Sequence, residues 1–228
     1  MSSASGLPEA PAQAVELFGE RFEVAREFAE LLATEASTRG LVGPREVGRL
    51  WDRHLLNCAV VSDLVPRDAR VVDVGSGAGL PGLVLAIRRP DLRVDLVEPL
   101  ERRVTFLNEA VARLRLGDTV RVVRGRAEEP GIVAMVGAAE WVTARAVAPL
   151  DRLVRWCLPM LQPGGWLLAL KGASAAMEVR EHRPAIDELG GRDTSVIRCG
   201  EGLLAEPTTV VRIRRGATPA RRGMKGRA

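Results

Sequence analysis

The chain has 228 residues, of which 46% are hydrophobic and 27% charged, as in an ordinary globular protein with a large core. No window approaches the ~18 uninterrupted apolar residues of a membrane span, and the first residues lack the basic-then-apolar order of a signal peptide. We therefore expect a cytoplasmic protein without membrane contact. The cysteines (Cys58, Cys157, Cys199) are odd in number and far apart, which argues against a disulfide framework or a metal site.

The positive charge is concentrated at the end of the sequence. Residues 216–228 contain Arg221, Arg222, Lys225 and Arg227 and no acid, so these four cations account for the whole net charge of +4. A flexible basic tail suits contacts with the phosphates of a nucleic acid. We therefore take Arg221, Arg222 and Lys225 as candidate substrate-binding residues, and a merely solubilising end stays open as the alternative.

The first third of the chain predicts two helices. Residues 11–38 carry an apolar stripe at spacings of three and four, formed by Val15, Phe18, Phe22, Ala25, Ala29 and Leu32. A second helix begins near Pro44 and runs to about residue 64, with an inward face formed by Val47, Leu50, Trp51, Leu55, Cys58 and Val61. We expect residues 1–64 to form an N-terminal helical cap.

From residue 70 the pattern changes to alternating strands and helices. Strands are predicted at 70–74, 93–98, 119–123, 140–145 and 165–172, and helices at about 79–88, 100–115, 150–161 and 174–189. Strands at 195–199 and 208–215 have no helix between them and predict an antiparallel hairpin. The pattern indicates a Rossmann-like α/β domain over 65–215, with a seven-stranded, mostly parallel sheet and a flexible tail after it.

The segment "DVGSGAGLPG" (73–82) follows the first strand of this domain. A dinucleotide fingerprint would need glycine where Leu80 stands, and the G-K-[ST] of a phosphate-binding P-loop is missing. The pattern D-x-G-x-G-x-G, with Asp73 inside the strand, instead fits a loop around an aminoacyl-nucleoside without phosphate. Gly75 and Gly77 then bring backbone N–H and C=O groups to the ligand.

Further candidate residues follow the other strands. Glu98, at the end of the second strand, is placed to accept the ribose hydroxyls, and Ala127 with Glu128, after the third, to line the adenine. Arg145 and Lys171 follow the fourth and fifth strands. Singly, each of these charges can be explained as a solvated rim residue. Together they converge on one edge of the sheet and indicate S-adenosylmethionine as the cofactor.

The chain resembles the small-subunit (16S) ribosomal RNA guanine-N7 methyltransferases, also called glucose-inhibited division protein B. The resemblance spans about residues 45–215 and depends on "LWDRHLLN", "DVGSGAGLPG", "LVEPLERRVTFL", "GRAEE", "TARAVAPL" and "LKG". It implies a class I methyltransferase fold and donor binding around Gly75, Leu80, Ala127, Glu128 and Arg145. The usual "RHILDS" of the family reads "RHLLNC" here, so Asn57 and Cys58 depart from it.

The reaction that the resemblance implies needs no general base, because guanine N7 already has an in-plane lone pair. We therefore name no catalytic acid or base. Arg145 is expected to bind the donor carboxylate or guanine O6, and Lys171 the substrate. His54 is taken as a structural group, with a role beside the donor pocket as the alternative.

Two other functions stay open at this point, and we expect a monomer in each case. One is a methyltransferase that acts on a small molecule or a protein. The other is a nucleotide-binding ribosome-assembly factor without catalysis.

Overall fold

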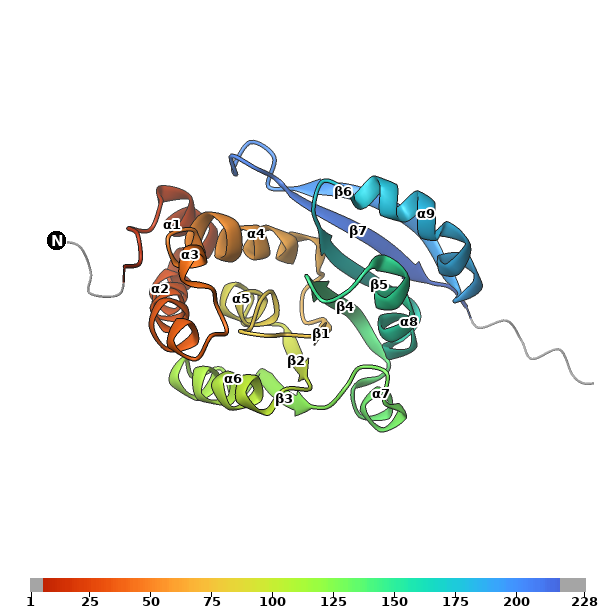
Figure 1. The fold of residues 1–228 in the computed structure, drawn as a ribbon, viewed down its shortest axis with the longest axis horizontal. Coiled ribbons are helices and arrows are strands. Elements are labelled where there is room, and N and C mark those ends of the chain that lie inside the picture. The colour runs from red at the N-terminus through yellow and green to blue at the C-terminus, as the bar shows by residue number, and fades with distance from the viewer. Residues whose placement is uncertain (1–5, 218–228) are drawn as a thin grey trace, which may run out of the picture.

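The computed structural model describes residues 6–217, which form one seven-stranded sheet in the order β3-β2-β1-β4-β5-β7-β6 (Figure 1). The strands are β1 (Arg70–Val74), β2 (Arg93–Glu98), β3 (Val120–Arg124), β4 (Ala139–Arg145), β5 (Leu161–Lys171), β6 (Gly191–Cys199) and β7 (Thr208–Arg215). Neighbours among β1 to β5 pair in parallel, whereas β7 runs antiparallel to both β5 and β6. The predicted parallel sheet with an antiparallel C-terminal hairpin is therefore confirmed.

Helices cover both faces of this sheet. They are α1 (Ala12–Phe18), α2 (Phe22–Leu31), α3 (Pro44–Val47), α4 (Leu56–Ala59), α5 (Gly82–Arg88), α6 (Glu101–Arg113), α7 (Pro130–Val136), α8 (Leu150–Cys157) and α9 (Ala175–Glu188). Short 3₁₀ or π-helical turns are η1 (Gly19–Arg21), η2 (Leu32–Ala36), η3 (Leu50–Leu55), η4 (Val60–Leu64) and η5 (Leu158–Met160).

Alternation along the strands divides the core into two layers. On β1, Val71 packs with the layer beneath α1 to α6, whereas Val72 and Val74 pack with the layer beneath α7, α8 and α9. Successive strand side chains point to opposite faces, so the valines of β1 fill both layers. The N-terminal helices and one face of the sheet therefore share a single apolar core.

The helix expected over residues 11–38 is interrupted. Gly19 has φ of +49°, which ends α1, and α2 begins three residues later. Val15, assigned to the apolar stripe, is 51% exposed, because the break turns α1 independently of α2. The second predicted helix is likewise broken after α3, at Gly48. A short helix that the sequence analysis did not predict, α7, begins at Pro130, and its run of apolar residues shows no clear helical period.

Arginine side chains fix the N-terminal helices against α5. Arg88 donates to the carbonyl oxygens of Leu17 (3.0 Å) and Ala59 (2.6 Å), and Arg21 donates to that of Ile87 (3.2 Å). Each bond joins a guanidinium to a carbonyl at the end of a helical segment, where such oxygens lack an intrahelical donor. The η3–α4 segment is therefore held in a defined position beside the carboxyl ends of the strands.

Candidate functional site

The glycine loop connects β1 to α5 in a tight turn. Gly75, Gly77 and Gly79 have φ of +71°, +58° and +93°, values that residues with a Cβ atom rarely adopt. The backbone N–H groups of Gly75 and Ser76 both donate to the carbonyl oxygen of Val97, at 2.8 and 3.2 Å. A Cβ atom at Gly75 would lie 2.7 Å from Val147 Cγ2, so the loop after β4 packs directly on the glycine loop.

Asp73 anchors the loop from below. Its fully buried carboxylate accepts hydrogen bonds from Thr143 Oγ1 at 2.8 Å and from the N–H of Gly82 at 3.2 Å. Burial raises the pKa of Asp73 to about 6, although the three hydrogen bonds from Thr143, Ser76 and Gly82 oppose the shift. The acid inside the strand therefore supports the loop from within the core.

Glu98 lies at the end of β2, next to the loop. Its Oε2 accepts from the N–H of Gly77 at 2.9 Å, and its Oε1 accepts from the N–H of Leu100 at 3.0 Å. Arg103 Nη1 lies 3.6 Å from Oε2, and Glu98 is 1% exposed. Each carboxylate oxygen can accept a second hydrogen bond. Glu98 thus has the chemistry that a ribose diol requires, in contact with the glycine loop.

A hollow of about 380 Å³ lies at the carboxyl ends of β2 and β3. We call it the β2–β3 hollow, and it is lined by Pro99, Leu100, Arg124, Gly125, Arg126 and Glu129. Of the predicted adenine contacts, Ala127 is buried and Glu128 is exposed, and neither is among these lining residues. Glu129, one position beyond Glu128, faces the hollow, because the turn before α7 carries it there.

Arg145 ends β4 and reaches toward η3. Its Nη2 lies 2.6 Å from His54 Nδ1 and 3.1 Å from the carbonyl oxygen of Arg53, and its Nη1 lies 3.1 Å from Cys58 Sγ. Burial raises the pKa of the Cys58 thiol, so the sulfur is a neutral contact. Our sequence analysis named Arg145, His54 and Cys58 separately but did not predict that they meet, because the partners of Arg145 come from a segment about ninety residues earlier in the chain.

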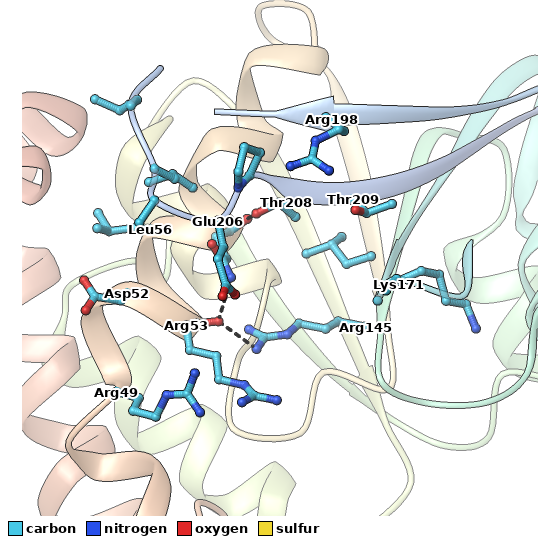
Figure 2. Close-up of a pocket in the computed structure, with 18 of the residues that line it drawn as sticks. Arg49, Asp52, Arg53, Leu56, Arg145, Lys171, Arg198, Glu206, Thr208 and Thr209 are labelled. Atoms are coloured by element: carbon cyan, nitrogen blue, oxygen red, sulfur yellow. Dashed lines mark hydrogen bonds between the residues drawn. The ribbon is translucent and has the colours of Figure 1, made fainter. Parts of the chain in front are cut away.

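Arg145 also lines a larger cavity of about 920 Å³, which we call the rim cavity (Figure 2). Arg49, Asp52 and Arg53 form one wall of it, and Arg198 and Thr208 form the wall across from them. Sequence analysis missed Arg198 and Thr208, which the β6–β7 hairpin brings to this edge. Arg198 forms an ion pair only with exposed Glu201 (3.3 Å), and Arg49 forms none within residues 6–217. The rim cavity therefore has a mixed polar and apolar lining, in which cations outnumber acids.

Lys171 lies at the edge of the rim cavity but points away from its centre (Figure 2). Its ammonium donates to Glu178 Oε2 at 2.8 Å and to the carbonyl oxygen of Ala148 at 2.9 Å, and its side chain is 11% exposed. Burial opposes ionisation of Glu178, but the hydrogen bond and charge of Lys171 lower the pKa of that carboxyl below its ordinary value. The predicted substrate contact is thus engaged in holding α9 and the loop after β4.

The predicted donor residues do not share one hollow in this structure. Arg145 lines the rim cavity, Glu98 and Gly77 bond each other between the two recesses, and Leu80 packs on the apolar core. Arg221, Arg222 and Lys225 lie outside the described residues. Within residues 6–217 there is no group of three or more His, Cys, Asp or Glu that could hold a metal, and no helix suited to cross a membrane.

The strand order, the antiparallel last pair of strands, and a glycine loop bonded to an acid at the end of β2 define a class I, Rossmann-like methyltransferase. Solved methyltransferases share the fold. Mitomycin 7-O-methyltransferase matches with a TM-score of 0.60 and 19% identity, over 90% of this chain and 68% of that one. Fibrillarin from Aeropyrum pernix, solved with natively bound S-adenosylmethionine, matches with a TM-score of 0.52 and 15% identity, over 71% and 74%.

Residues 21–207 match the model of the GidB family, described as rRNA small subunit methyltransferase G, and the chain belongs to that family. A relative of that name from Salinispora arenicola is 58% identical, over 96% of this chain and 95% of its own length. Another, from Streptomyces avermitilis, is 53% identical, over 96% of this chain and 91% of its own length. The family resemblance expected from the sequence motifs is therefore confirmed.

Proposed function

We propose that this protein transfers the methyl group of S-adenosylmethionine to N7 of a guanine in 16S rRNA of the small ribosomal subunit. The observation that carries the proposal is the family match over residues 21–207, together with relatives named as ribosomal RNA small subunit methyltransferase G at more than half identity. The geometry of the carboxyl edge supports it, because the chain supplies groups suited to each part of the donor.

The donor would lie along the loop after β1. The backbone of Gly75 and Gly77 and the side chain of Leu80 would meet its amino-acid end. Glu98 would accept the two ribose hydroxyls with its remaining lone pairs. The adenine would lie toward the β2–β3 hollow, beside Ala127 and the Glu128–Glu129 pair. The donor supplies a sulfonium methyl group, which is electrophilic and carries positive charge.

The acceptor guanine would enter from the rim cavity, whose volume of about 920 Å³ is ample for one nucleotide. N7 attacks with its own lone pair and loses no proton, so the chain needs only to hold N7 in line with the sulfonium methyl. Arg145 is the side chain placed for the guanine, because its guanidinium lines the cavity while the Lys171 ammonium is bound to Glu178. Flanking phosphates would contact Arg49, Arg53 and Arg198, and beyond them Arg221, Arg222 and Lys225 of the tail.

We further propose that the enzyme acts in the cytoplasm, as a monomer and without metal. The ribosomal substrate supports the cytoplasmic assignment. The absence of a metal follows from the chemistry, because attack by a neutral ring nitrogen on a sulfonium needs no Lewis acid.

The test combines donor binding with analysis of the modified RNA. Calorimetry with S-adenosylhomocysteine should show one site per chain. Small subunits from a strain that lacks the enzyme, incubated with the protein and methyl-labelled donor, should gain one methyl group in one 16S fragment. Borohydride reduction and aniline should then cleave the RNA at that guanine, which identifies N7-methylguanosine. Donor binding with an unchanged RNA mass would instead favour an assembly factor or another substrate.

A further inference from the structure

A chain of hydrogen bonds runs from α3 through η3 to the end of β4. Glu46 Oε2 lies 2.7 Å from His54 Nε2, and His54 Nδ1 lies 2.6 Å from Arg145 Nη2. His54 thus joins a partly exposed carboxylate to the guanidinium that lines the rim cavity. Its own side chain is 14% exposed, so water has little access to the imidazole.

The chemistry of the two ends fixes the protonation of His54. A guanidinium has five N–H donors and no acceptor, so Nδ1 of His54 must accept the hydrogen bond from Arg145. A carboxylate only accepts, so Nε2 must carry the proton and donate it to Glu46. One tautomer of the neutral imidazole satisfies both contacts. A doubly protonated ring would instead place an N–H of His54 against an N–H of Arg145.

The surrounding charges favour this neutral form. Arg145 on β4 and Arg53 on η3 face His54 from two elements, and Glu46 on α3 is the acid that faces it. Arg49 and Arg53 in turn face Glu46 and help to keep that carboxylate ionised. Burial, with Arg145, lowers the pKa of His54 below its ordinary value of 6.5, against the opposing influence of Glu46.

The remaining donors of Arg145 point to a use for this arrangement. Three of its five N–H groups are taken by His54, Cys58 and the carbonyl oxygen of Arg53. The Nε–H and one hydrogen on Nη1 have no partner within residues 6–217, and the side chain lines the rim cavity (Figure 2). In guanine, O6 is an acceptor adjacent to N7. A guanidinium held in place could bind O6 and leave N7 free for the methyl group.

We propose that His54 is a positioning residue: as the Nε2–H tautomer held by Glu46, it fixes the Arg145 guanidinium for the guanine at the acceptor end of the site. This rests on the proposed function, since it names the group that aligns the acceptor in that reaction. Protonation of His54 releases Arg145, so methyl transfer has an acid limb that depends on His54.

Two substitutions separate the two ring nitrogens. His54→Asn places an amide oxygen near the position of Nδ1, which can still accept from Arg145 and cannot be protonated. His54→Gln reaches the position of Nε2 and keeps a donor for Glu46 but leaves Arg145 without that acceptor. We expect H54N to retain most of the activity at neutral pH and to lose the acid limb. We expect H54Q to lose about tenfold in kcat, the worth of one good hydrogen bond, with unchanged KM for the donor.

Imidazole ¹⁵N spectra test the hydrogen-bond chain without any assay of activity. The protein has two histidines, so His182→Gln assigns the signals of His54. The expected result is the Nε2–H tautomer, titrating below pH 6.5. An Nδ1–H tautomer, or a charged ring at neutral pH, would overturn the inference.

The activity assays distinguish a failure of the proposed function from a failure of the positioning role of His54. A wild-type protein that does not methylate small-subunit RNA would overturn the proposed function and with it the acceptor role. An active wild type together with an equally active, correctly folded H54Q would overturn the positioning role alone. Thermal unfolding and donor calorimetry on both variants show whether the fold and the donor site are intact.

Discussion

The hydroxyl of Thr143 on β4 donates a 2.8 Å hydrogen bond to the carboxylate of Asp73 on β1, and both side chains are fully buried. The second oxygen of Asp73 accepts from the N–H of Gly82, the first residue of α5. One carboxylate therefore connects two neighbouring strands to the helix that follows the glycine loop, and fixes the loop at both ends.

This buried acid should make stability depend on pH. The pKa of Asp73 rises from 3.8 to about 6 on folding, a shift worth on the order of 3 kcal/mol. Because the folded state disfavours the ionised form, the free energy of unfolding falls as pH rises from about 4 to about 6 and is level above that. Asp73→Asn removes the titration. Urea unfolding should show wild type losing ~3 kcal/mol relative to D73N between about pH 4 and pH 7.

Thr143→Val provides the matched control. The hydroxyl of Thr143 favours the ionised carboxylate, so its removal raises the folded-state pKa of Asp73 further. The pH window then extends to higher pH, while its lower end, set by the unfolded chain, stays near pH 4. A wild-type-to-D73N difference that is the same at every pH would contradict this account of Asp73.

The strand, loop and helix around Asp73 could be predicted because their signals are local. A valine-rich strand, a glycine cluster and a proline stand within one short stretch of sequence. The strand pattern also placed Glu98 and Arg145 at the carboxyl ends of their strands, where the structure has them. It could not show where their side chains point. That depends on contacts made by distant elements, such as the bond of Arg145 to His54 and the engagement of Lys171 by Glu178.

Packing of Val147 on Gly75 makes the glycine loop sensitive to one added methyl group. In Gly75→Ala the Cβ would lie 2.7 Å from Val147 Cγ2, at a φ of +71° that costs ~1–2 kcal/mol for an L residue. We expect calorimetry to show about tenfold weaker binding of S-adenosylhomocysteine or worse. Adding Val147→Ala should recover part of this loss, because it relieves the contact but not the φ.

Gly117→Ala is the control for that series, since nothing lies within 4 Å of its added Cβ. It should bind the donor product as wild type does. Equal affinity of G75A and wild type would show that the loop adjusts freely, and that its glycines are not required for the donor.

Glu98→Gln tests the proposed ribose contact with little change of shape. The amide group would face a backbone N–H of Gly77 or Leu100 with a second donor, and the negative charge that favours ribose hydroxyls is lost. A charged hydrogen bond of ~1.5–3 kcal/mol predicts affinity for S-adenosylhomocysteine about 10- to 100-fold lower. Glu101→Gln, at a side chain that is 74% exposed nearby, should leave the affinity unchanged. If both variants bind like wild type, the ribose lies elsewhere.

The cations of the rim cavity predict a distinct phenotype for RNA binding. Arg49 and Arg198 stand on opposite walls and are exposed, and the one ion pair of Arg198, with exposed Glu201, is weak, so each can contact a phosphate next to the bound nucleotide. Substituting either with Ala should weaken binding to small subunits and make the plot of log affinity against log salt shallower by about one per residue. Donor affinity should not change, since neither residue lines the β2–β3 hollow.

Arg67→Ala is the matched control for these two variants. This exposed arginine precedes β1, at the opposite end of the strands, so its loss should leave the salt dependence as it is in wild type. An unaltered salt slope in R49A and R198A would place the RNA on another face of the molecule.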